Sequence, residues 1–438
     1  MDPGKAWIEA LGRSDLRGSE FLAQVGEMGI LFDGKPLCAH RQPLFLAEGQ
    51  VQIFARILAD FHSAVRKAKE LLLSGGLGDG SLAAEMGLTQ AQRRLASIDP
   101  GHSSAATLSR LDTFCPGGHP WILELNAESP TGIGYSDALT SLLREDPLFA
   151  QVGPFGGFRS ADAALRALHA TFEEWGGSGT PQMAIVDFLD VPTRGDFHLL
   201  AQSFERHGQP CPLVDPRDLV FERGQLWGPS GPINLVYRRF LVEDMIRRPE
   251  DCAALLAAYE TGAACFVNSL QTSLLHSKGL FALLHSPLMK PHLSPAESKV
   301  IREHVPFTAM LNEGPLGPGE SWSHIRQSRE DWVIKPVSDS GGRGIVFGHD
   351  CDKAEWEAAL VQEQAVVQRL VSNWVLPFPD ARNDYALQEC LVDLAPFLIR
   401  GRLAGFMCRL SQAAPVNVSQ GAHLVPVFVF NPSTGVVQ

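Results

Sequence analysis

The chain has 438 residues, a formal net charge of −12 and a pI near 5.6. Hydrophobic residues make up 45% and charged residues 20%, a balance typical of a globular protein long enough for two or three domains. The acidic charge argues against nonspecific binding to nucleic acid or to an anionic membrane, so a bound phosphate would need local positive side chains.

Targeting segments and zinc sites are not expected. The sequence has no run of about 18 apolar residues, which a membrane-spanning helix needs. Residues 1–15 lack the basic region and apolar core of a secretory signal. The eight cysteines include no CxxC pair, and the 14 histidines form no HxxxH or HExxH motif. We therefore expect a cytoplasmic protein with reduced thiols.

Residues 7–97 are expected to be mainly helical. A helix begins near Trp7, a short strand and turn cover Ile30–Pro36, and a helical stretch covers Leu82–Ser97. Between them, Glu48–Leu73 predicts a long amphipathic helix. Its apolar residues recur at helical spacing and are expected to face the core: Val51, Phe54, Ala55, Leu58, Phe61 and Val65.

The stretch Arg110–Tyr135 predicts a hairpin with a charged face. Its parts are the strands Leu108–Phe114 and Trp121–Leu125 and the turn Pro116–Gly118. Side chains alternate along a strand, so Arg110 shares a face with Asp112, and Glu124 with Asn126. If these faces coincide, they bring together the oxygen ligands that Mg²⁺ takes, usually beside waters and nucleotide phosphates. A solvated charged face is the alternative.

Residues 158–240 alternate helix and strand, which predicts parallel strands covered by helices. The expected elements are helices Ala161–Trp175 and Asp196–His207, strands Met183–Leu189, Pro212–Val214 and Ile233–Arg238, and a hairpin over Leu219–Trp227. Arg239 follows the last strand at the edge where such sheets usually bind ligands. It could hold a substrate carboxylate bidentately, or form an ion pair with Glu243 or Asp244.

A glycine-rich loop follows a lysine-bearing strand near residue 335. Strand Trp332–Ile334 leads to Lys335, and strand Ile345–Phe347 follows the loop. The small loop residues are Ser338, Ser340, Gly341, Gly342 and Gly344. Small residues let backbone N–H groups point at phosphate oxygens, and the lysine adds a mobile positive charge. The pattern is neither a P-loop nor a Rossmann GxGxxG fingerprint.

Helices and strands also surround this loop. We expect a loop entering a helix over Phe266–Leu284, with Lys278 inside it, and a helix over Ser294–Val305. After the loop come a helix over Lys353–Gln362 and a strand over Ala365–Leu370. The strand-rich end, Gln388–Phe430, contains a hairpin that turns at Arg400 and Gly401 and places Arg409 at the end of its second strand.

The Lys-Pro strand, the glycine-rich flap and the Asp…Glu-x-Asn set resemble the ATP-grasp ligases, which include D-alanine:D-alanine ligase and glutathione synthetase. In that family the flap lysine comes first and Glu-x-Asn last, whereas here Glu124 precedes Lys335. The sequence therefore resembles a circularly permuted ATP-grasp protein, similar to the synthetase domain of glutathionylspermidine synthase and related bacterial carboxylate-amine ligases. Arg409, Asn417 and Gly421 also resemble the glutathione synthetase pattern.

The resemblance implies an α/β (α+β) fold, namely the ATP-grasp fold in circularly permuted order with a Rossmann-like substrate domain. Residues 1–157 would be the permuted C-terminal part with the Mg²⁺-binding hairpin, and 158–310 the Rossmann-like pre-ATP-grasp domain. Residues 311–372 would form the central ATP-binding domain with its flap. The remaining strands of the catalytic domain would lie in 373–438.

The resemblance also implies roles for individual residues. Mg²⁺ would be held by Asp112, Glu124 and Asn126. ATP would contact Lys335, Lys278, Ser340, Gly341, Gly342, Gly344, Gln368, Leu370 and Asn417, and the catalytic cations would be Arg409 and Arg110. For Lys278, a solvated helix lysine is the alternative. The family often has an acidic residue at the adenine hinge where this chain has QRLV at 368–371, so side-chain pairing by Gln368 stays open.

The implied activity is ATP-dependent carboxylate-amine ligation through an acyl phosphate, with release of ADP and phosphate. Amino acids or small peptides are the expected substrates, without nucleic acid or membrane partners, and dimers are common among similar enzymes. A phosphotransferase that uses the same site is the alternative, and a nucleotide-binding protein without turnover is a third hypothesis.

Overall fold

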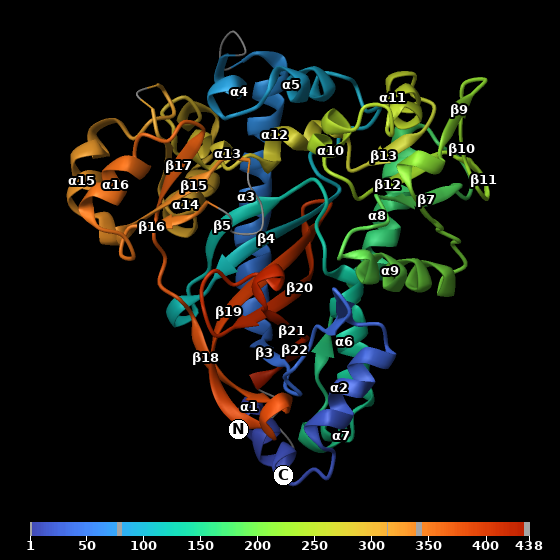
Figure 1. Cartoon of the computed structure of the whole chain (residues 1–438), viewed down its shortest axis with the longest axis vertical. Helices are drawn as coiled ribbons and strands as arrows, with labels where there is room; N and C mark the ends of the chain where they lie inside the picture. Colours follow the sequence, from blue (N-terminus) through green and yellow to red (C-terminus); the bar gives the residue numbers. More distant parts are fainter. Residues whose placement is uncertain (1, 77–80, 313, 339–343, 433–438) are drawn as a thin grey trace.

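The computed structural model describes residues 2–76, 81–312, 314–338 and 344–432. A central body carries two flanking units at one end, on opposite sides of a central sheet (Figure 1). Each flanking unit is built on its own four-stranded sheet. The space where the three sheets approach one another contains the candidate site.

The central six-stranded sheet joins segments from distant parts of the chain. Its strands, in order across the sheet, are β21 (His423–Val425), β20 (Arg402–Ser411), β19 (Ala386–Ile399), β4 (Leu108–Phe114) and β5 (Trp121–Asn126), and β18 (Val375–Asp380) also pairs with β19. All of these pairs are antiparallel. The two hairpins predicted for this part of the fold, β4–β5 and β19–β20, are confirmed, and they lie side by side through the β4–β19 pairing.

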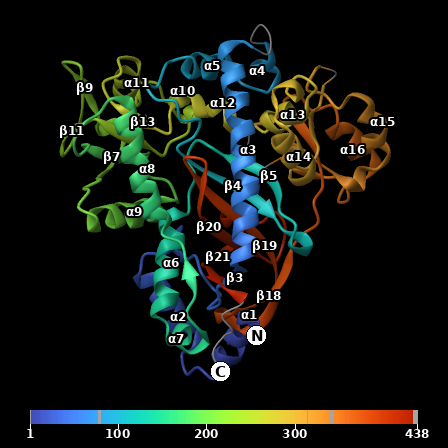
Figure 2. The same ribbon diagram turned by 180° about the vertical axis from the view of Figure 1, so that it is seen from behind.

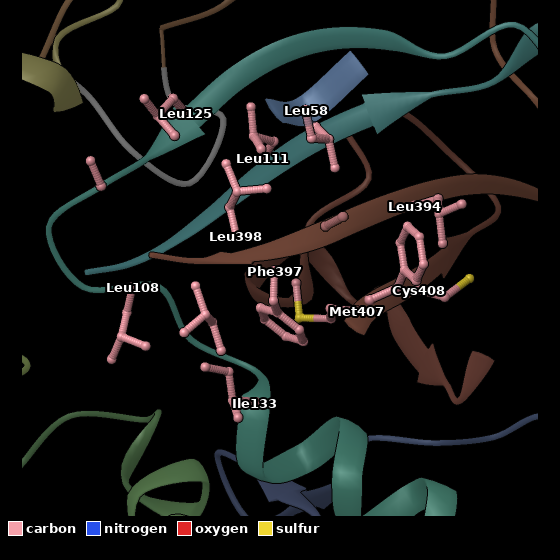
Figure 3. Close-up of a cluster of buried hydrophobic side chains, with 14 of the residues drawn as sticks. Leu58, Leu108, Leu111, Leu125, Ile133, Leu394, Phe397, Leu398, Met407 and Cys408 are labelled. Carbon is pink, nitrogen blue, oxygen red and sulfur yellow. The ribbon is translucent and has the colours of Figure 1, made fainter. Parts of the chain in front are cut away.

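One face of this sheet is covered by the long helix α3 (Glu48–Ser74), which crosses it in Figure 2. Of the residues predicted to face the core, Phe54, Leu58, Phe61 and Val65 are buried. Leu58 lies beside Leu111 of the sheet in Figure 3. Burying a side chain of this size contributes about 1.5–3 kcal/mol, so the apolar face fixes the sheet against the helix. Because side chains alternate, the charged residues of β4 point to the other face.

The first flanking unit is a parallel sheet covered by helices, as the alternating pattern predicts. Its strand order is β13 (Cys265–Val267), β12 (Leu235–Arg238), β7 (Met183–Val186) and β8 (Leu213–Val214). The helices are α8 (Ser160–Trp175), α9 (Arg194–Arg206), α10 (Val242–Arg247) and α11 (Ala253–Glu260). The residues of β7, β12 and β13 are all buried, as expected for parallel strands with both faces covered.

A small antiparallel sheet extends this unit and divides one predicted strand. It consists of β9 (Val220–Glu222), β10 (Gln225–Gly228) and β11 (Gly231–Ile233). The strand predicted over Ile233–Arg238 is therefore two strands, because Ile233 pairs within this small sheet and β12 begins at Leu235. The strand predicted to reach Leu189 ends at Val186.

The second flanking unit has the strand order β14 (Thr308–Met310), β17 (Ala365–Arg369), β15 (Trp332–Pro336) and β16 (Val346–Phe347). Helices α15 (Trp322–Gln327) and α16 (Lys353–Ala359) pack around its own core, which includes Trp332 and Trp356. The domain boundary predicted at residue 310 separates β14 from the sheet to which it belongs. The division into four domains otherwise stays a prediction.

The remaining elements pack around the central sheet or beside the flanking units. They are α1 (Pro3–Leu11), α2 (Gly18–Glu27), β1 (Leu31–Phe32), β2 (Lys35–Pro36), α4 (Ser81–Glu85), α5 (Gln90–Ala96), α6 (Ile133–Glu145), α7 (Pro147–Val152), α12 (Ser273–His276), α13 (Gly279–His285) and α14 (Pro295–His304). A further sheet has the order β3 (Leu44–Ala47), β22 (Val427–Phe430) and β6 (Gly156–Gly157). The helix predicted over Leu82–Ser97 is two helices, separated at Gly87, whose φ of 84° favours glycine.

The state of the cysteines and the character of the helices bear on two expectations drawn from the composition. All eight cysteines are free, and all except Cys351 are buried, as expected for reduced structural thiols. None of the described helices has the length and apolar character needed to cross a bilayer.

Candidate active site

A cavity of about 580 Å³ lies where the three larger sheets approach one another. The hairpins β4–β5 and β19–β20, the flap strands and the parallel sheet contribute to its wall. The predicted site residues on this wall are Arg110, Asp112, Glu124, Asn126, Arg239, Lys278, Lys335, Gln368, Leu370, Arg409 and Asn417. Segments that are far apart in the sequence therefore line one space.

The acidic hairpin has the register that its alternation predicts. Arg110 is paired with Asn126 and Asp112 with Glu124. The Asn126 amide donates to the Asp112 carboxylate at 3.3 Å. Asp112 and Glu124 are only 17% and 23% exposed, so the alternative of a fully solvated face is wrong.

Two guanidinium groups neutralise Asp112. The Nη2 atom of Arg409 lies 2.8 Å from its Oδ2, and Nε of Arg110 donates to its Oδ1 at 3.2 Å. Burial alone would raise the pKa of Asp112, but the charges of Arg409 and Arg110 outweigh burial and lower it to about 2. Asp112 is therefore ionised at neutral pH.

Asp393 is part of this cluster, although the sequence analysis did not identify it. It lies on β19 directly opposite Arg409 and accepts from Nη2 at 2.9 Å and from Nε at 3.3 Å. Its side chain is 4% exposed, and burial, together with the charge of Asp112, raises the pKa of Asp393. The available signal was one acidic residue in the otherwise apolar run CLVDLAPFLI.

Two lysines lie on the flap side of the cavity. Nζ of Lys278 is 3.3 Å from Oε1 of Glu124, and Nζ of Lys335 donates to Oε1 of Gln368 at 2.6 Å. Burial, assisted by the charge of Lys278, lowers the pKa of Lys335 to about 8 although Glu124 opposes the shift. The Lys278 side chain is 11% exposed, so the interpretation as a solvated helix lysine is wrong.

The residues of the predicted adenine hinge already have several hydrogen bonds within the protein. Besides accepting from Lys335, the Gln368 side chain donates to Leu123 O at 3.3 Å and to Thr308 Oγ1 at 3.0 Å. The backbone N–H of Leu370 donates to Asp331 O. Side-chain pairing of Gln368 with adenine therefore conflicts with its contacts.

The remaining predicted nucleotide residues are only partly described. Ser340, Gly341 and Gly342 lie outside the described residues. Gly344 has a φ of 69°, a conformation that favours glycine. Asn417 begins a short 3₁₀ helix, and its Oδ1 accepts from the backbone of Ser419.

Arg239 does not have the free guanidinium that bidentate carboxylate binding requires. Its Nη1 donates to Pro130 O and to the Tyr237 hydroxyl, and its Nη2 donates to Thr131 Oγ1 at 3.0 Å. Nη2 also lies 3.6 Å from Asp196, and both side chains are 0% exposed. The predicted substrate role is therefore wrong in that form, and so is the predicted ion pair with Glu243 or Asp244.

Residues 50–411 match the family described as circularly permuted ATP-grasp type 2. The chain belongs to this ATP-grasp family. The permuted order of Glu-x-Asn and flap lysine in the sequence is thereby explained, and the mixed α/β fold is that of a circularly permuted ATP-grasp protein.

Relatives of this ATP-grasp chain include two Frankia proteins. A protein of Frankia casuarinae, provisionally named glutamate–cysteine ligase 2-2, is 25% identical over 348 residues. Its counterpart in Frankia alni, provisionally named glutamate–cysteine ligase 2-3, is 25% identical over 345 residues. Each match covers 72% of this chain but only 37% of the relative.

One solved structure has a similar fold over nearly the whole chain. The glutathione synthetase-like effector GSS30 of Globodera pallida, in its apo form, has a TM-score of 0.59 and 12% identity. The match covers 94% of this chain and 96% of the effector. At this identity the likeness concerns the fold alone.

The residues of the acidic hairpin fit a magnesium ion that is shared with a nucleotide. No group of three or more His, Cys, Asp or Glu side chains in the described parts of the chain could hold a metal. Mg²⁺, however, commonly takes one or two carboxylates and completes its octahedron with waters and phosphate oxygens. Asp112, Glu124 and the amide oxygen of Asn126 offer that set. The chain's own cations neutralise both carboxylates in this structure.

Proposed function

We propose that this ATP-grasp protein is an ATP-dependent carboxylate-amine ligase that forms an amide through an acyl phosphate. One observation carries the proposal: the acidic hairpin shares a cavity with Lys278, Lys335 and Arg409. Oxygen ligands beside several cations suit a metal-bound triphosphate and the charge that develops during phosphoryl transfer. The family and the names of the Frankia relatives support the same chemistry.

In the first half-reaction the substrate carboxylate attacks the γ-phosphorus, so that an O–P bond forms and ADP leaves. Lys335 and Lys278 neutralise the phosphates, and Arg409 stabilises the transferring phosphoryl group. Mg²⁺, held by Asp112, Glu124 and Asn126, would act there as a Lewis acid on the phosphate oxygens. Arg110 orients Asp112 through its hydrogen bond.

In the second half-reaction an amine nitrogen attacks the acyl carbon, phosphate departs with the C–O electron pair, and the nitrogen loses a proton. No protein nucleophile is needed. The cavity must exclude water because an acyl phosphate hydrolyses when exposed. We further propose that the parallel-sheet unit is a Rossmann-like substrate domain, because the carboxyl ends of its strands reach the cavity wall.

The test measures ADP and phosphate release from MgATP across the twenty amino acids, offered singly and in pairs. L-Glutamate with L-cysteine is the first pair because the relatives bear that name. Glu124→Gln is the inactive variant, and Glu145→Gln, at an exposed position on α6, is the matched control.

Release that requires an acid and an amine, is lost in Glu124→Gln and persists in Glu145→Gln supports the ligase. Release with a single substrate and a phosphorylated product would replace the ligase by a phosphotransferase. If the protein binds nucleotide but releases no ADP or phosphate with any pair of amino acids, both the ligase and the phosphotransferase activity would be contradicted.

A further inference from the structure

The cavity has a second, acidic end at the carboxyl edge of the parallel sheet. Asp187 follows β7, and Arg239 follows the neighbouring strand β12. The backbone N–H of Arg239 donates to Val186 O, so the two residues are neighbours at this edge. Both line the cavity, as does Asp244 from the first turn of α10. Ligands commonly bind outside this edge of parallel sheets.

Asp187 is a buried carboxylate with little compensation from the protein. It is 5% exposed, and the hydrogen bond to one of its oxygens comes from the backbone of Phe188 at 2.8 Å. The arginines whose charges act on Asp187, Arg238 and Arg239, form their ion pairs with Glu128 and Asp196. The Asp244 carboxylate accepts from the backbone N–H of Leu241 at 2.9 Å. Burying a carboxylate without a cation is costly, and burial raises the pKa of Asp187 to about 7 although Arg239 opposes the shift.

The neighbouring arginine supplies only part of that charge: it opposes the rise in the pKa of Asp187, but its ion pair is with Asp196. The charge of Arg239 is balanced by Asp196 at 3.6 Å, and its two terminal nitrogens are occupied by Pro130, Thr131 and Tyr237. An anionic substrate group is also disfavoured here, because it would meet the carboxyl groups of Asp187 and Asp244. The acidic edge is therefore chemically opposite to the cationic end around Arg409 and Lys335.

Because Asp187 and Asp244 both line the cavity at the carboxyl edge of the parallel sheet, we propose that they form the subsite for the protonated amino group of the amine substrate. The apolar part of that substrate would lie against the cavity-lining side chains Val191, Pro192, Phe240 and Leu241. The substrate class is thus a primary amine, an amino acid included, that enters as an ammonium ion and must release one proton to solvent before its nitrogen attacks the acyl carbon. This inference rests on the proposed ligase function and divides its two substrates between the two ends of the cavity.

Hydroxylamine separates this subsite from the rest of the reaction. It is small and uncharged at neutral pH, and it traps an acyl phosphate as a hydroxamate without needing an ammonium site. The hydroxylamine nitrogen forms the new N–C bond, phosphate leaves with the C–O electron pair, and the nitrogen loses a proton. Hydroxamate formation therefore reports the first half-reaction alone, and amide formation reports both.

The experiment compares wild type, Asp187→Asn, Asp244→Asn and the control Asp190→Asn. Asp190 is exposed on the loop after β7 and does not line the cavity. Each protein receives MgATP, every panel acid in turn, and either hydroxylamine or the panel amino acids as amine probes, beginning with L-cysteine. Circular dichroism checks the fold, and Asp244→Asn keeps the test available if Asp187→Asn does not fold.

We expect Asp187→Asn to raise the KM for the amine about tenfold or more, as loss of a charged hydrogen-bond partner predicts. Its hydroxamate rate should stay within about twofold of wild type, and Asp190→Asn should match wild type in both reactions. An unchanged amine KM in both cavity variants would overturn the subsite, as would equal loss of amide and hydroxamate in folded protein. Hydroxamate formation by wild type without amide from any amine probe would also overturn it. Absence of hydroxamate with every acid would instead reject the ligase itself.

Discussion

Nucleotide binding should weaken with rising pH because of Lys335. Its ammonium is neutralised in part by Glu124, but burial lowers the pKa to about 8. If phosphate binds only the protonated lysine, the apparent Kd scales as one plus the ratio of neutral to protonated Lys335. That factor rises from about 1.3 at pH 7.5 to about 11 at pH 9, an increase of about eightfold or about 1.2 kcal/mol.

The assay is calorimetric titration of MgADP at pH 7.5, 8.0, 8.5 and 9.0. Lys335→Arg should remove most of the increase, because arginine stays protonated throughout this range. Lys290→Arg, at an exposed position on a 3₁₀ turn, is the matched control and should keep the wild-type profile. A flat wild-type profile, or the same eightfold loss in Lys335→Arg, would refute the assignment of the titrating group.

Two further variants test the buried ion pairs. Asp393→Asn removes an ionic acceptor of Arg409 but leaves the contact between Arg409 and Asp112. We expect kcat to fall about tenfold, the lower end of the range for loss of a charged hydrogen bond. Unchanged kcat in steady-state assays would mean that Asp393 does not position the guanidinium. Arg239→Met leaves the buried Asp196 without its cation and should destabilise the parallel-sheet unit by about 3 kcal/mol, while the exposed control Arg206→Met should not. Hydrogen exchange in β7 and β12 measures that loss, and equal protection in both variants would contradict the predicted role of the pair.

The local parts of the site could be predicted because they follow from side-chain alternation. Alternation in β4 and β5 places Asp112 and Glu124 on one face, and the observed register agrees. Helical spacing likewise identifies the face of α3 that packs on the sheet. Neither inference needs knowledge of distant segments, since period and turn residues act within one hairpin or one helix.

The pairing of Asp393 with Arg409 depends on a β-bulge that the sequence does not reveal. Near the turn, Ile399 pairs with Arg402, and an uninterrupted ladder would place Asp393 opposite Cys408. The register shifts between Phe397 and Leu398, which moves Asp393 opposite Arg409. A shift of one residue changes which side chains share a face. The pairing of these two charges therefore required the structure.

The ion-pair partner of Arg239 also could not be predicted from the sequence, because that partner lies on a helix from another part of the chain. The sequence neighbours of Arg239, Glu243 and Asp244, were reasonable partners, whereas the observed partner, Asp196, lies on α9. That helix packs beside α6, where Asp196 also accepts from the backbone of Gly132 and Tyr135. Satisfying these buried donors requires an acid at this point, but only the packed arrangement of the helices identifies which acid.

Asp112, Asp393 and Arg409 belong to three neighbouring strands, and this arrangement explains how the permuted chain order can keep their cluster together. Asp112 is on β4, Asp393 on β19 and Arg409 on β20, so the guanidinium reaches across β19 to the acid on β4. Side chains of adjacent strands interact through lateral pairing, which does not depend on the order of the strands along the chain. Asp393 lies on the intervening strand and holds the arginine that spans it. The geometry of the site therefore depends on the β4–β19 pairing, and a substitution that disturbs that pairing should separate Asp112 from Arg409 even where every site residue is retained.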